Sequence, residues 1–338
     1  MRTSVSPELP PSLRVAIETI VGTHDRDRLE AAAARLSETY RAGGRRASRV
    51  ARTREDVAAY AAYRAPATYA AAVDVLQRVS IHLPGWQPRS VLDVGAGPGV
   101  ASWAAAAVWP GIARFTLVEA EPEMIAAGRH LAAAAPSARL AAARWVRGDA
   151  SAAVENADLV LASYVLGELD AQSVESVVRR LWSSADVACA VIEPGTPAGY
   201  RRVIAARSLL IAAGGVVVAP CPHDGDCPLV GDDWCHFSTR LPRNEMHRAV
   251  KRVSRGFEDE KLSYVVMSRG PVERAPARVI RPPVIRSGHL YLDTCEPEGV
   301  ARRIVSRRDK DAYRAARRLG WGDALAIGPS STSNTEQS

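Results

Sequence analysis

Three of the five cysteines of this chain lie within a short segment that is rich in Pro, Gly and Asp. The segment contains Cys221, Cys227 and Cys235, and Cys295 follows much later in Leu-Asp-Thr-Cys. Thiolates are soft ligands for zinc and for iron–sulfur clusters. The spacing C-x5-C-x7-C is neither the paired C-x-x-C of zinc ribbons nor the C-x3-C-x2-C of radical enzymes. It leaves room for a multi-iron cluster, which is larger than a single ion.

Several kinds of chemistry are compatible with these cysteines. Zinc, with His223 or His236 as a further ligand, is the alternative to an iron–sulfur cluster. Reduced buried thiols and redox cysteines are the interpretations without a metal. Cys189 lies inside the apolar run Val187–Ile192 and is predicted to be a core residue. An odd number of cysteines argues against a secreted disulfide framework, so we expect a reducing compartment.

A glycine-rich turn forms the second candidate site. Residues 92–99 (Leu-Asp-Val-Gly-Ala-Gly-Pro-Gly) follow a β-branched run, and glycines there let the backbone approach a ligand closely. A dinucleotide fingerprint would have Gly or Ala where this chain has Val100. Asp93 would repel a pyrophosphate but could pair with a cationic amino-acid moiety. The pattern therefore favours S-adenosylmethionine (SAM) over NAD and predicts a binding loop of Asp93, Gly95, Gly97 and Gly99.

Acidic residues follow the next two strands of the same pattern. Glu119 ends the second β-branched run, where a carboxylate can accept both ribose hydroxyls. Asp149 and Ala150 follow the third run and are placed to reach the adenine edge. The loop and both acids in successive strand-end positions predict a SAM pocket. The alternative is a tight turn with two surface acids.

The fourth run is followed by Ser-Tyr-Val-Leu-Gly-Glu-Leu at residues 163–169. Many base-modifying methyltransferases carry an Asn/Asp-Pro-Pro-aromatic run at this point, and this chain does not. Tyr164 could stack on a base and is the one candidate catalytic residue, with a partly buried structural tyrosine as the alternative.

A parallel sheet would bring these motifs together. From residue 90 onward, short β-branched runs alternate with Ala-rich helical patterns, which predicts an α/β fold. Helices are expected near 98–108, 122–134, 171–182 and 198–213, with a short one near 243–253. Seven runs predict a seven-stranded, doubly wound, Rossmann-like sheet of the SAM-methyltransferase type: Val91–Val94, Phe115–Glu119, Arg144–Arg147, Leu159–Ser163, Val187–Ile192, Val216–Ala219 and Tyr264–Met267.

The remaining segments flank or interrupt this sheet. The Pro-rich stretch 271–283 is expected to be a linker, and His289–Asp293 with Ala301–Ser306 a β-hairpin. The sequence predicts a helical N-terminal region (1–85), a methyltransferase domain (86–270) with an inserted cysteine-rich loop (220–240), a small β and basic C-terminal extension (271–327) and a disordered tail (328–338).

Positive charge is concentrated in two segments. Residues 41–54 hold six Arg and no acid, and residues 300–318 hold eight basic residues against two Asp, so the rest of the chain is net acidic. Such patches suit a polyanion such as RNA, and the alternative is a solvated surface in an Arg-rich protein. The candidate RNA-binding residues are Arg45, Arg46, Arg49, Arg302, Arg303, Arg307 and Arg308.

Seven segments together resemble the methyltransferase-like family of small-ribosomal-subunit assembly proteins, known in mitochondria and found in bacteria. The resemblance covers roughly residues 55–323, and its most specific part is the cysteine segment. The segments are Arg64–Tyr69, Val91–Gly99, Ser163–Leu169, Val191–Pro197, Ala219–Leu229, Asp233–Phe237 and Arg318–Asp323.

The resemblance implies a SAM-methyltransferase fold, association with 16S-type ribosomal RNA of the small subunit, and a [4Fe–4S] cluster. The cluster ligands would be Cys221, Cys227, Cys235 and Cys295, and the SAM contacts would be the loop 95–99, Glu119 and Asp149. Prolines near the start interrupt any leader-like apolar run, and no stretch approaches the roughly 20 apolar residues of a membrane helix. We therefore expect a monomer in the bacterial cytoplasm without a membrane partner.

Three functions are compatible with these features. The first is a SAM-dependent methyltransferase acting on small-subunit rRNA, supported by the complete set of pocket residues. The second is a non-catalytic rRNA-binding assembly factor, supported by the absent Asn-Pro-Pro-aromatic run and by charge outside the SAM domain. The third is a zinc-containing small-molecule methyltransferase, against which the basic flanks speak.

Overall fold

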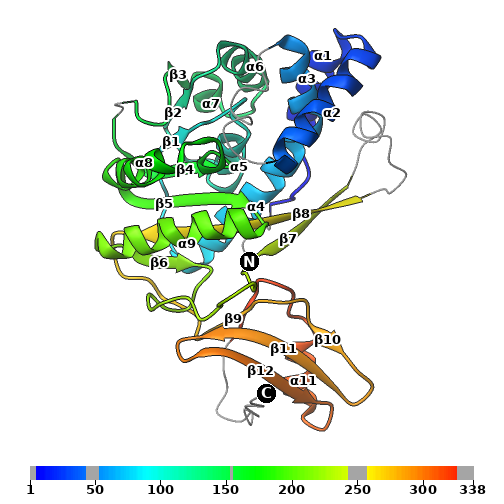
Figure 1. Ribbon diagram of the computed structural model, residues 1–338, viewed down its shortest axis with the longest axis vertical. Coiled ribbons are helices and arrows are strands. Elements are labelled where there is room, and N and C mark those ends of the chain that lie inside the picture. Colours follow the sequence, from blue (N-terminus) through cyan, green and yellow to red (C-terminus); the bar gives the residue numbers. More distant parts are fainter. Residues whose placement is uncertain (1–4, 43–52, 153–154, 243–256, 326–338) are drawn as a thin grey trace.

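The computed structural model describes residues 5–42, 53–152, 155–242 and 257–325, and these form an α/β body with a smaller β-sheet beside it (Figure 1). The candidates Arg45, Arg46 and Arg49, the helix expected near 243–253 and the tail 328–338 lie outside the described residues. The described helices are α1 (Pro11–Gly22), α2 (Arg26–Ala42), α3 (Arg54–Tyr63), α4 (Ala65–His82), α5 (Val100–Val108), α6 (Pro122–Ala133), α7 (Ala138–Ala141), α8 (Ala171–Ser183), α9 (Pro197–Ala212) and α11 (Lys310–Ala316), with a 3-10 turn at Leu166–Glu168.

The central sheet has the strand order β3-β2-β1-β4-β5-β8-β6, and β7 pairs with the free part of β8. Strands β1 to β5 are parallel, whereas β8 runs antiparallel to β5, β6 and β7. The strands are β1 (Ser90–Val94), β2 (Arg114–Glu119), β3 (Arg144–Arg147), β4 (Ala157–Ser163), β5 (Ala185–Pro194), β6 (Val216–Ala219), β7 (Phe237–Pro242) and β8 (Phe257–Ser268).

This topology confirms the predicted doubly wound α/β fold. All seven β-branched runs are strands of the sheet, and the four helices expected between them are α5, α6, α8 and α9. The strand order turns at β1, and β8 is inserted antiparallel between β5 and β6, as in the Rossmann-like methyltransferase fold. The sequence analysis missed β7, the eighth strand of the sheet.

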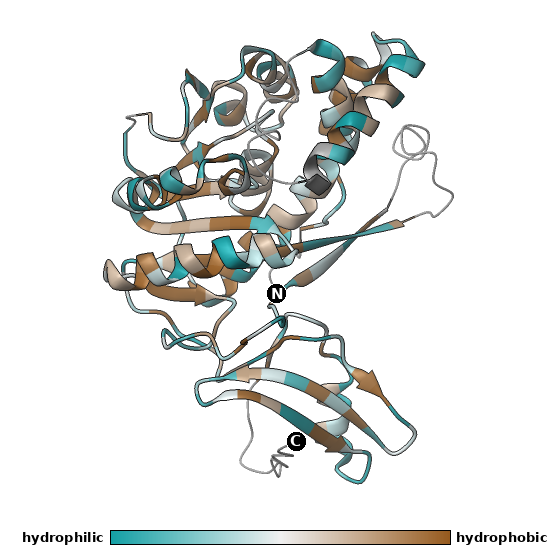
Figure 2. Ribbon diagram, in the orientation of Figure 1, coloured by the Kyte–Doolittle hydropathy of each residue, from teal (hydrophilic) through white to brown (hydrophobic). Residues whose placement is uncertain are grey.

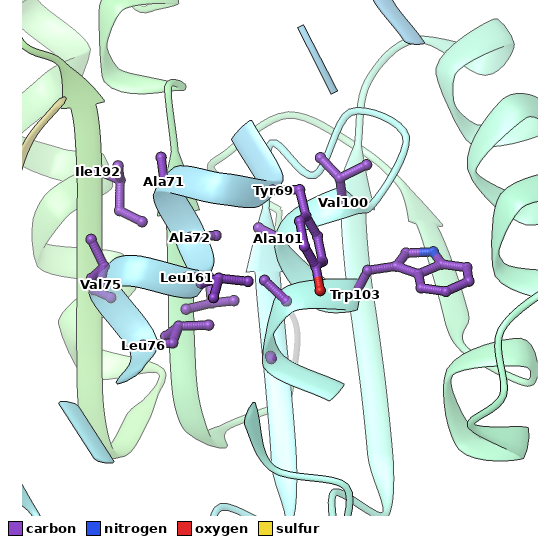
Figure 3. Close-up of a cluster of buried hydrophobic side chains, with 14 of the residues drawn as sticks. Tyr69, Ala71, Ala72, Val75, Leu76, Val100, Ala101, Trp103, Leu161 and Ile192 are labelled. Carbon is purple, nitrogen blue, oxygen red and sulfur yellow. The ribbon is translucent and has the colours of Figure 1, made fainter. Parts of the chain in front are cut away.

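Helices cover both faces of the sheet and form two cores. On one face, α4 and α5 pack on the strands, and Figure 3 shows Tyr69, Val75 and Leu76 of α4 beside Trp103 of α5 and Leu161 of β4. On the other face, α8 and α9 pack on the same strands through a second buried cluster. Small residues dominate α4, so the helix can approach the sheet closely; its buried residues include Ala65, Ala67, Ala70, Ala71 and Ala72.

Local sequence signals explain where the helices begin. Thr53 and Asp56 form a reciprocal capping box at α3, in which each side chain accepts the backbone N–H of the other residue. Thr196 caps α9 by accepting from Gly199 N at 3.1 Å, and Pro197 takes the first helical position, where no N–H is needed. Both caps fix the residue at which the helix begins.

The C-terminal sheet has five described strands and lies beside the end of the body that carries β6 (Figure 1). The predicted hairpin is confirmed as β11 and β12, which pair antiparallel across the Glu-Pro-Glu-Gly turn. The expectation that 271–283 is a linker is wrong for β9, which is buried and pairs with β11 and β13. The strands are β9 (Ala277–Val279), β10 (Val284–Ile285), β11 (His289–Glu296), β12 (Gly299–Ser306) and β13 (Ala324–Leu325).

Among the described residues, no helix has both the length and the apolar character that crossing a bilayer requires.

Candidate functional site

The carboxyl edge of the parallel strands brings the predicted SAM residues together. The glycine loop follows β1, Glu119 ends β2, and Asp149 with Ala150 follows β3, and these three strands are neighbours in the sheet. The backbone joins them further, because Gly148 N donates to Glu119 O at 3.0 Å and Ala96 N donates to Val118 O at 3.0 Å. Ligands of open α/β sheets bind at this edge, where the strand order reverses.

The three glycines of the loop are required by backbone conformation. Gly95, Gly97 and Gly99 have φ values of +66°, +53° and +79°, a region that side chains with a Cβ avoid. A Cβ on Gly95 would lie 2.4 Å from Val165 Cγ2, whereas a Cβ on Gly97 would meet only Tyr60 Oη at 3.8 Å. Gly97 therefore faces open space, the side on which a ligand can approach the backbone.

Glu119 holds the glycine loop in place. Its Oε2 accepts from Gly97 N at 2.7 Å, and its Oε1 accepts from Ala120 N at 2.8 Å and from Glu121 N at 2.9 Å. Burial raises the pKa of this carboxyl, although the three N–H donors oppose the shift. A carboxylate offers about four acceptor positions, so these donors leave little free capacity for ribose hydroxyls.

Two other predicted SAM residues have different surroundings. Asp93 is 1% exposed, accepts from Ser102 Oγ at 2.8 Å, and has no described partner for Oδ1. Burial raises the pKa of the Asp93 carboxyl to about 6. Asp149 is exposed and accepts from Ser151 N at 2.8 Å, and Ala150 beside it is buried. Asp93 is thus buried and connects β1 to α5 through Ser102, while Asp149 lies at the exposed edge.

The structure adds two residues to this edge that the sequence analysis did not assign. Tyr60 of α3 lies over the loop at Gly97, and burial raises the pKa of its hydroxyl to about 12. Glu168 follows β4, and burial together with the charges of Glu119 and Glu193 raises its pKa to about 8. Neither residue has a signal in the local pattern, because each reaches the site through the fold. A carboxylate at Glu168 would suit a cationic ligand.

Tyr164 is packed inside the protein. It is 8% exposed, its hydroxyl donates to Glu260 Oε1 at 3.0 Å, and the Arg64 guanidinium lies 5.1 Å from its ring centroid. Arg64 Nη2 also contacts Glu260 Oε1 at 3.3 Å, which closes a group of three. Tyr164 has φ +61°, a strained conformation that is held by this packing. The buried alternative is therefore the one observed, and the ring is not open for stacking on a base.

The four predicted metal ligands line one pocket, although they come from two parts of the chain. Cys221 follows β6, Cys227 and Cys235 lie in the loop before β7, and Cys295 is on β11. Tyr200 Oη and Cys227 Sγ are 3.1 Å apart, and Ser263 Oγ donates to Cys235 O at 2.8 Å. Cys189 is fully buried inside β5 and away from this pocket, which confirms its prediction as a core residue.

The surroundings of the four thiols raise the pKa of individual cysteines and so disfavour their ionisation. Burial, followed by the neighbouring Cys221 and Cys227, raises the pKa of Cys295 to about 12. Burial and the other three cysteines raise the pKa of Cys235 well above its usual value. His223 Nε2 lies 3.7 Å from Cys295 Sγ, and His236 stacks on Trp234 with ring centroids 5.2 Å apart. Neither histidine is among the residues that line the pocket.

Two buried arginines also line this pocket. Arg207 is 3% and Arg278 4% exposed, and neither forms an ion pair with any residue that the structure describes. Arg207 donates to His223 O and Gly225 O at 2.8 and 2.7 Å, and Arg278 Nε donates to Pro220 O at 2.8 Å. Backbone carbonyls satisfy these N–H groups but not the charge. Burying an unpaired charge is costly, so the pocket is suited to an anionic group.

The described part of the chain has no group of three or more His, Cys, Asp or Glu side chains placed around a single metal ion. The four thiols instead line one pocket together with Arg207 and Arg278. An iron–sulfur cluster spreads four thiolates over a larger body than one ion does, and its thiolate shell is anionic. The donor set and the buried cations fit such a group.

The predicted RNA-binding arginines of the C-terminal sheet divide into two kinds. Arg303 contacts Glu296 on the packed face, with Nε to Oε1 at 2.8 Å, and its side chain is only 14% exposed. Arg302 contacts Asp293 on the other face at 2.7 Å and is 64% exposed. Arg307 and Arg308 are exposed at the end of β12. Arg303 is therefore structural in its surroundings, and the other three face solvent.

Comparison with known proteins gives a family and two groups of relatives. The family model described as "Mitochondrial small ribosomal subunit Rsm22" matches residues 54–326. The chain is 27% identical over 291 residues to the human "Ribosome assembly protein METTL17, mitochondrial", covering 79% of this chain and 62% of that protein. It is 28% identical over 328 residues to the Schizosaccharomyces pombe "Rsm22-cox11 tandem protein 2, mitochondrial", covering 81% of this chain and 44% of that protein. The chain thus spans less than two thirds of either relative's length.

Among solved structures, the chain is similar to magnesium protoporphyrin IX methyltransferase (ChlM) from Synechocystis PCC 6803 with bound SAM. The identity is 13%, the TM-score is 0.41, and the match covers 60% of this chain and 80% of that one. The fold assignment rests on the strand order described above, and the family assignment rests on the match to residues 54–326. This chain belongs to the Rsm22 family of mitochondrial small ribosomal subunit proteins.

Proposed function

We propose that this protein takes part in assembly of the small ribosomal subunit, binds its 16S-type rRNA, and carries SAM and a [4Fe–4S] cluster. Family membership supports the ribosomal role, since the human relative is named a ribosome assembly protein. The glycine loop, which Glu119 holds in place, and Asp149 at the same sheet edge support SAM. The proposal places SAM on the parallel half of the sheet and the cluster beyond its antiparallel half.

The observation that carries the metal centre is the pair of buried arginines beside four thiols. Neutral thiols would leave Arg207 and Arg278 without a counter-charge in the interior. Four thiolates around iron supply negative charge at that point, and the arginines in turn favour the thiolate form. Burial raises the pKa of the Cys221 thiol, and Arg207 opposes this shift. The charges of pocket and cluster are therefore complementary.

One observation supports a cluster over zinc, for which a histidine would be an expected further ligand. The nearest histidine, His223, contacts one cysteine only. With a cluster, Cys295 would connect the C-terminal sheet to the body, which gives the centre a structural role.

A non-catalytic role is favoured over methylation by the surroundings of Tyr164. A methyl acceptor would have to approach the edge of the sheet beside β4, where Tyr164, Arg64 and Glu260 contact one another and Tyr164 is buried. Transfer requires the acceptor atom to lie in line with the methyl group, and the buried ring of Tyr164 offers no surface there on which a base could stack. Incubation with radiolabelled SAM and immature small subunits separates the two roles, because only a methyltransferase labels the rRNA.

The proposal is tested by purifying the protein without oxygen and measuring iron, sulfide and zinc with the visible spectrum. About four iron and four sulfide per chain with a broad visible band is the expected result. One zinc without iron would contradict the cluster and leave the fold and family unchanged. Neither metal would contradict the metal centre as a whole. Cys189→Ser should keep the same metal content, since Cys189 lies in the core away from the pocket.

A further inference from the structure

The C-terminal sheet has one packed face and one open face. Side chains alternate along β11, so Leu290 and Leu292 pack toward α11 while Tyr291 points to the opposite side. Cross-strand partners share a face, which places Ile304 of β12 and Val284 of β10 beside Tyr291. Both aliphatic side chains are 41% exposed. Figure 2 shows β10 as an apolar strand at the margin of this sheet.

Tyr291 and His289 form a fixed aromatic pair on the open face. The ring centroids are 4.7 Å apart at 80°, and Tyr291 Oη lies 2.7 Å from His289 Nε2. Arg302 lies with its Cζ 5.9 Å from the tyrosine ring centroid, and Asp293 holds its guanidinium through contacts of 2.7 and 3.2 Å. These contacts fix the orientation of the ring before any partner arrives, and both aromatic residues stay partly exposed.

The end of the same sheet is strongly basic. Arg286 in the β10–β11 turn and Arg307 and Arg308 after β12 are exposed. Arg307 N donates to Gly288 O at 3.0 Å, and its Nη1 donates to Ser287 O at 3.0 Å, so the two turns lie together. In the portion of the chain that the structure describes, these three guanidiniums have no ion pair. Their charge is therefore available to an anionic partner.

We propose that the open face of the C-terminal sheet binds a single-stranded segment of RNA. Bases would stack on Tyr291 between Val284 and Ile304, and phosphates would lie along Arg286, Arg307 and Arg308. This inference rests on the proposed function only in taking RNA as the partner. Aromatic platforms hold unpaired bases, whose faces are free, and do not reach the stacked bases of a duplex.

Charge distinguishes this partner from a protein. Exposed Val284 and Ile304 alone would suit an apolar protein surface. The unpaired cations at the end of the sheet instead match a polyanion, and the tyrosine supplies a flat apolar surface between them.

The test uses the full chain and a fluorescent single-stranded RNA of about 12 nucleotides, with the same sequence as a duplex for comparison. We expect tighter binding of the single strand. Tyr291→Ala should weaken it by roughly 5- to 100-fold, the effect of losing one stacked base, while Tyr291→Phe should bind like the wild type. Arg307→Gln with Arg308→Gln should reduce the slope of log Kd against log salt by about 1.4. Arg179→Gln is the control for loss of an exposed arginine elsewhere, on α8, where Arg179 pairs with Glu175.

The outcomes separate this inference from the proposed function. Equal affinity of Tyr291→Ala and the wild type would overturn the stacking platform and leave RNA binding intact. Preference of the wild type for the duplex would overturn it as well. Failure of the wild type to bind either RNA would contradict both proposals. If Tyr291→Ala does not fold, as judged by circular dichroism, the double arginine variant decides, and an unchanged salt slope would refute the assignment.

Discussion

Replacing Glu119 by Gln should loosen the glycine loop, because one carboxylate accepts three backbone N–H groups. A Gln oxygen can still serve Ala120 and Glu121, but its NH2 then faces Gly97 N–H. One hydrogen bond to a charged acceptor is lost, at about 1.5–3 kcal/mol, and the other two become weaker. Removing a buried charge beside Glu168 offsets part of this. We expect a net loss of about 2 kcal/mol, or about 3 °C in Tm for a chain of 338 residues.

The measurement is thermal unfolding by circular dichroism together with calorimetric titration of SAM. SAM should bind at least about tenfold more weakly, since a lost hydrogen bond of about 1.4 kcal/mol has that effect. Glu123→Gln is the matched control, because that residue lies nearby on α6, pairs with Arg54 at 3.5 Å and is 39% exposed. It should change stability by less than about 0.5 kcal/mol. Equal Tm values for the two variants, or unchanged SAM affinity in Glu119→Gln, would refute the role given to Glu119.

Three further changes test other parts of the structure. Gly95→Ala should lower the free energy of unfolding in urea by about 2–3 kcal/mol, because Ala is strained at this positive φ and its Cβ would clash with Val165. Adding Val165→Ala should remove only the clash, so full recovery of stability would contradict the backbone strain. Glu168→Gln should flatten the dependence of Tm on pH. Burial raises the pKa of Glu168 from 4.5 to about 8 in the folded protein, so the wild type loses stability as the pH rises between these two values. Parallel plots of Tm against pH for the variant and the wild type would disprove this. Arg207→Gln should shorten the lifetime of the proposed cluster in air. Without the cluster, the Tm of this variant should be no lower than that of the wild type. An unchanged cluster lifetime would show that Arg207 does not stabilise the cluster.

The parallel strands and their order along the chain could be predicted because each strand is a compact β-branched run between Ala-rich helices. Strand β7 was missed because Phe-Ser-Thr-Arg-Leu-Pro has few β-branched residues and becomes a strand by pairing with β8, the next described strand along the chain. Strand β9 was missed for a related reason. Its three residues lie among prolines, and only the partners β11 and β13 make them a strand.

The residues of the site were predictable where the backbone or the chemistry demands one residue type. Gly95 needs a positive φ, and a thiol has few substitutes as a soft ligand. Tyr60, Arg207 and Arg278 could not be found this way, since each reaches its pocket from a helix or strand distant in sequence. Arg303 shows the opposite error, because counting charge along a segment cannot distinguish a paired side chain from a solvated one.

Strand β8 has a consequence for how the chain folds during synthesis. Among the described strands, β6 pairs only with β8, which begins 38 residues after β6 ends, at Phe257 against Ala219. A growing chain therefore completes β6 long before its partner emerges, and the edge of β5 stays open meanwhile. Insertion of β8 must close that long loop before the new pairs stabilise it. One late strand thus supplies the partners of β5, β6 and β7 together, and its arrival closes the segment that holds three of the cysteines.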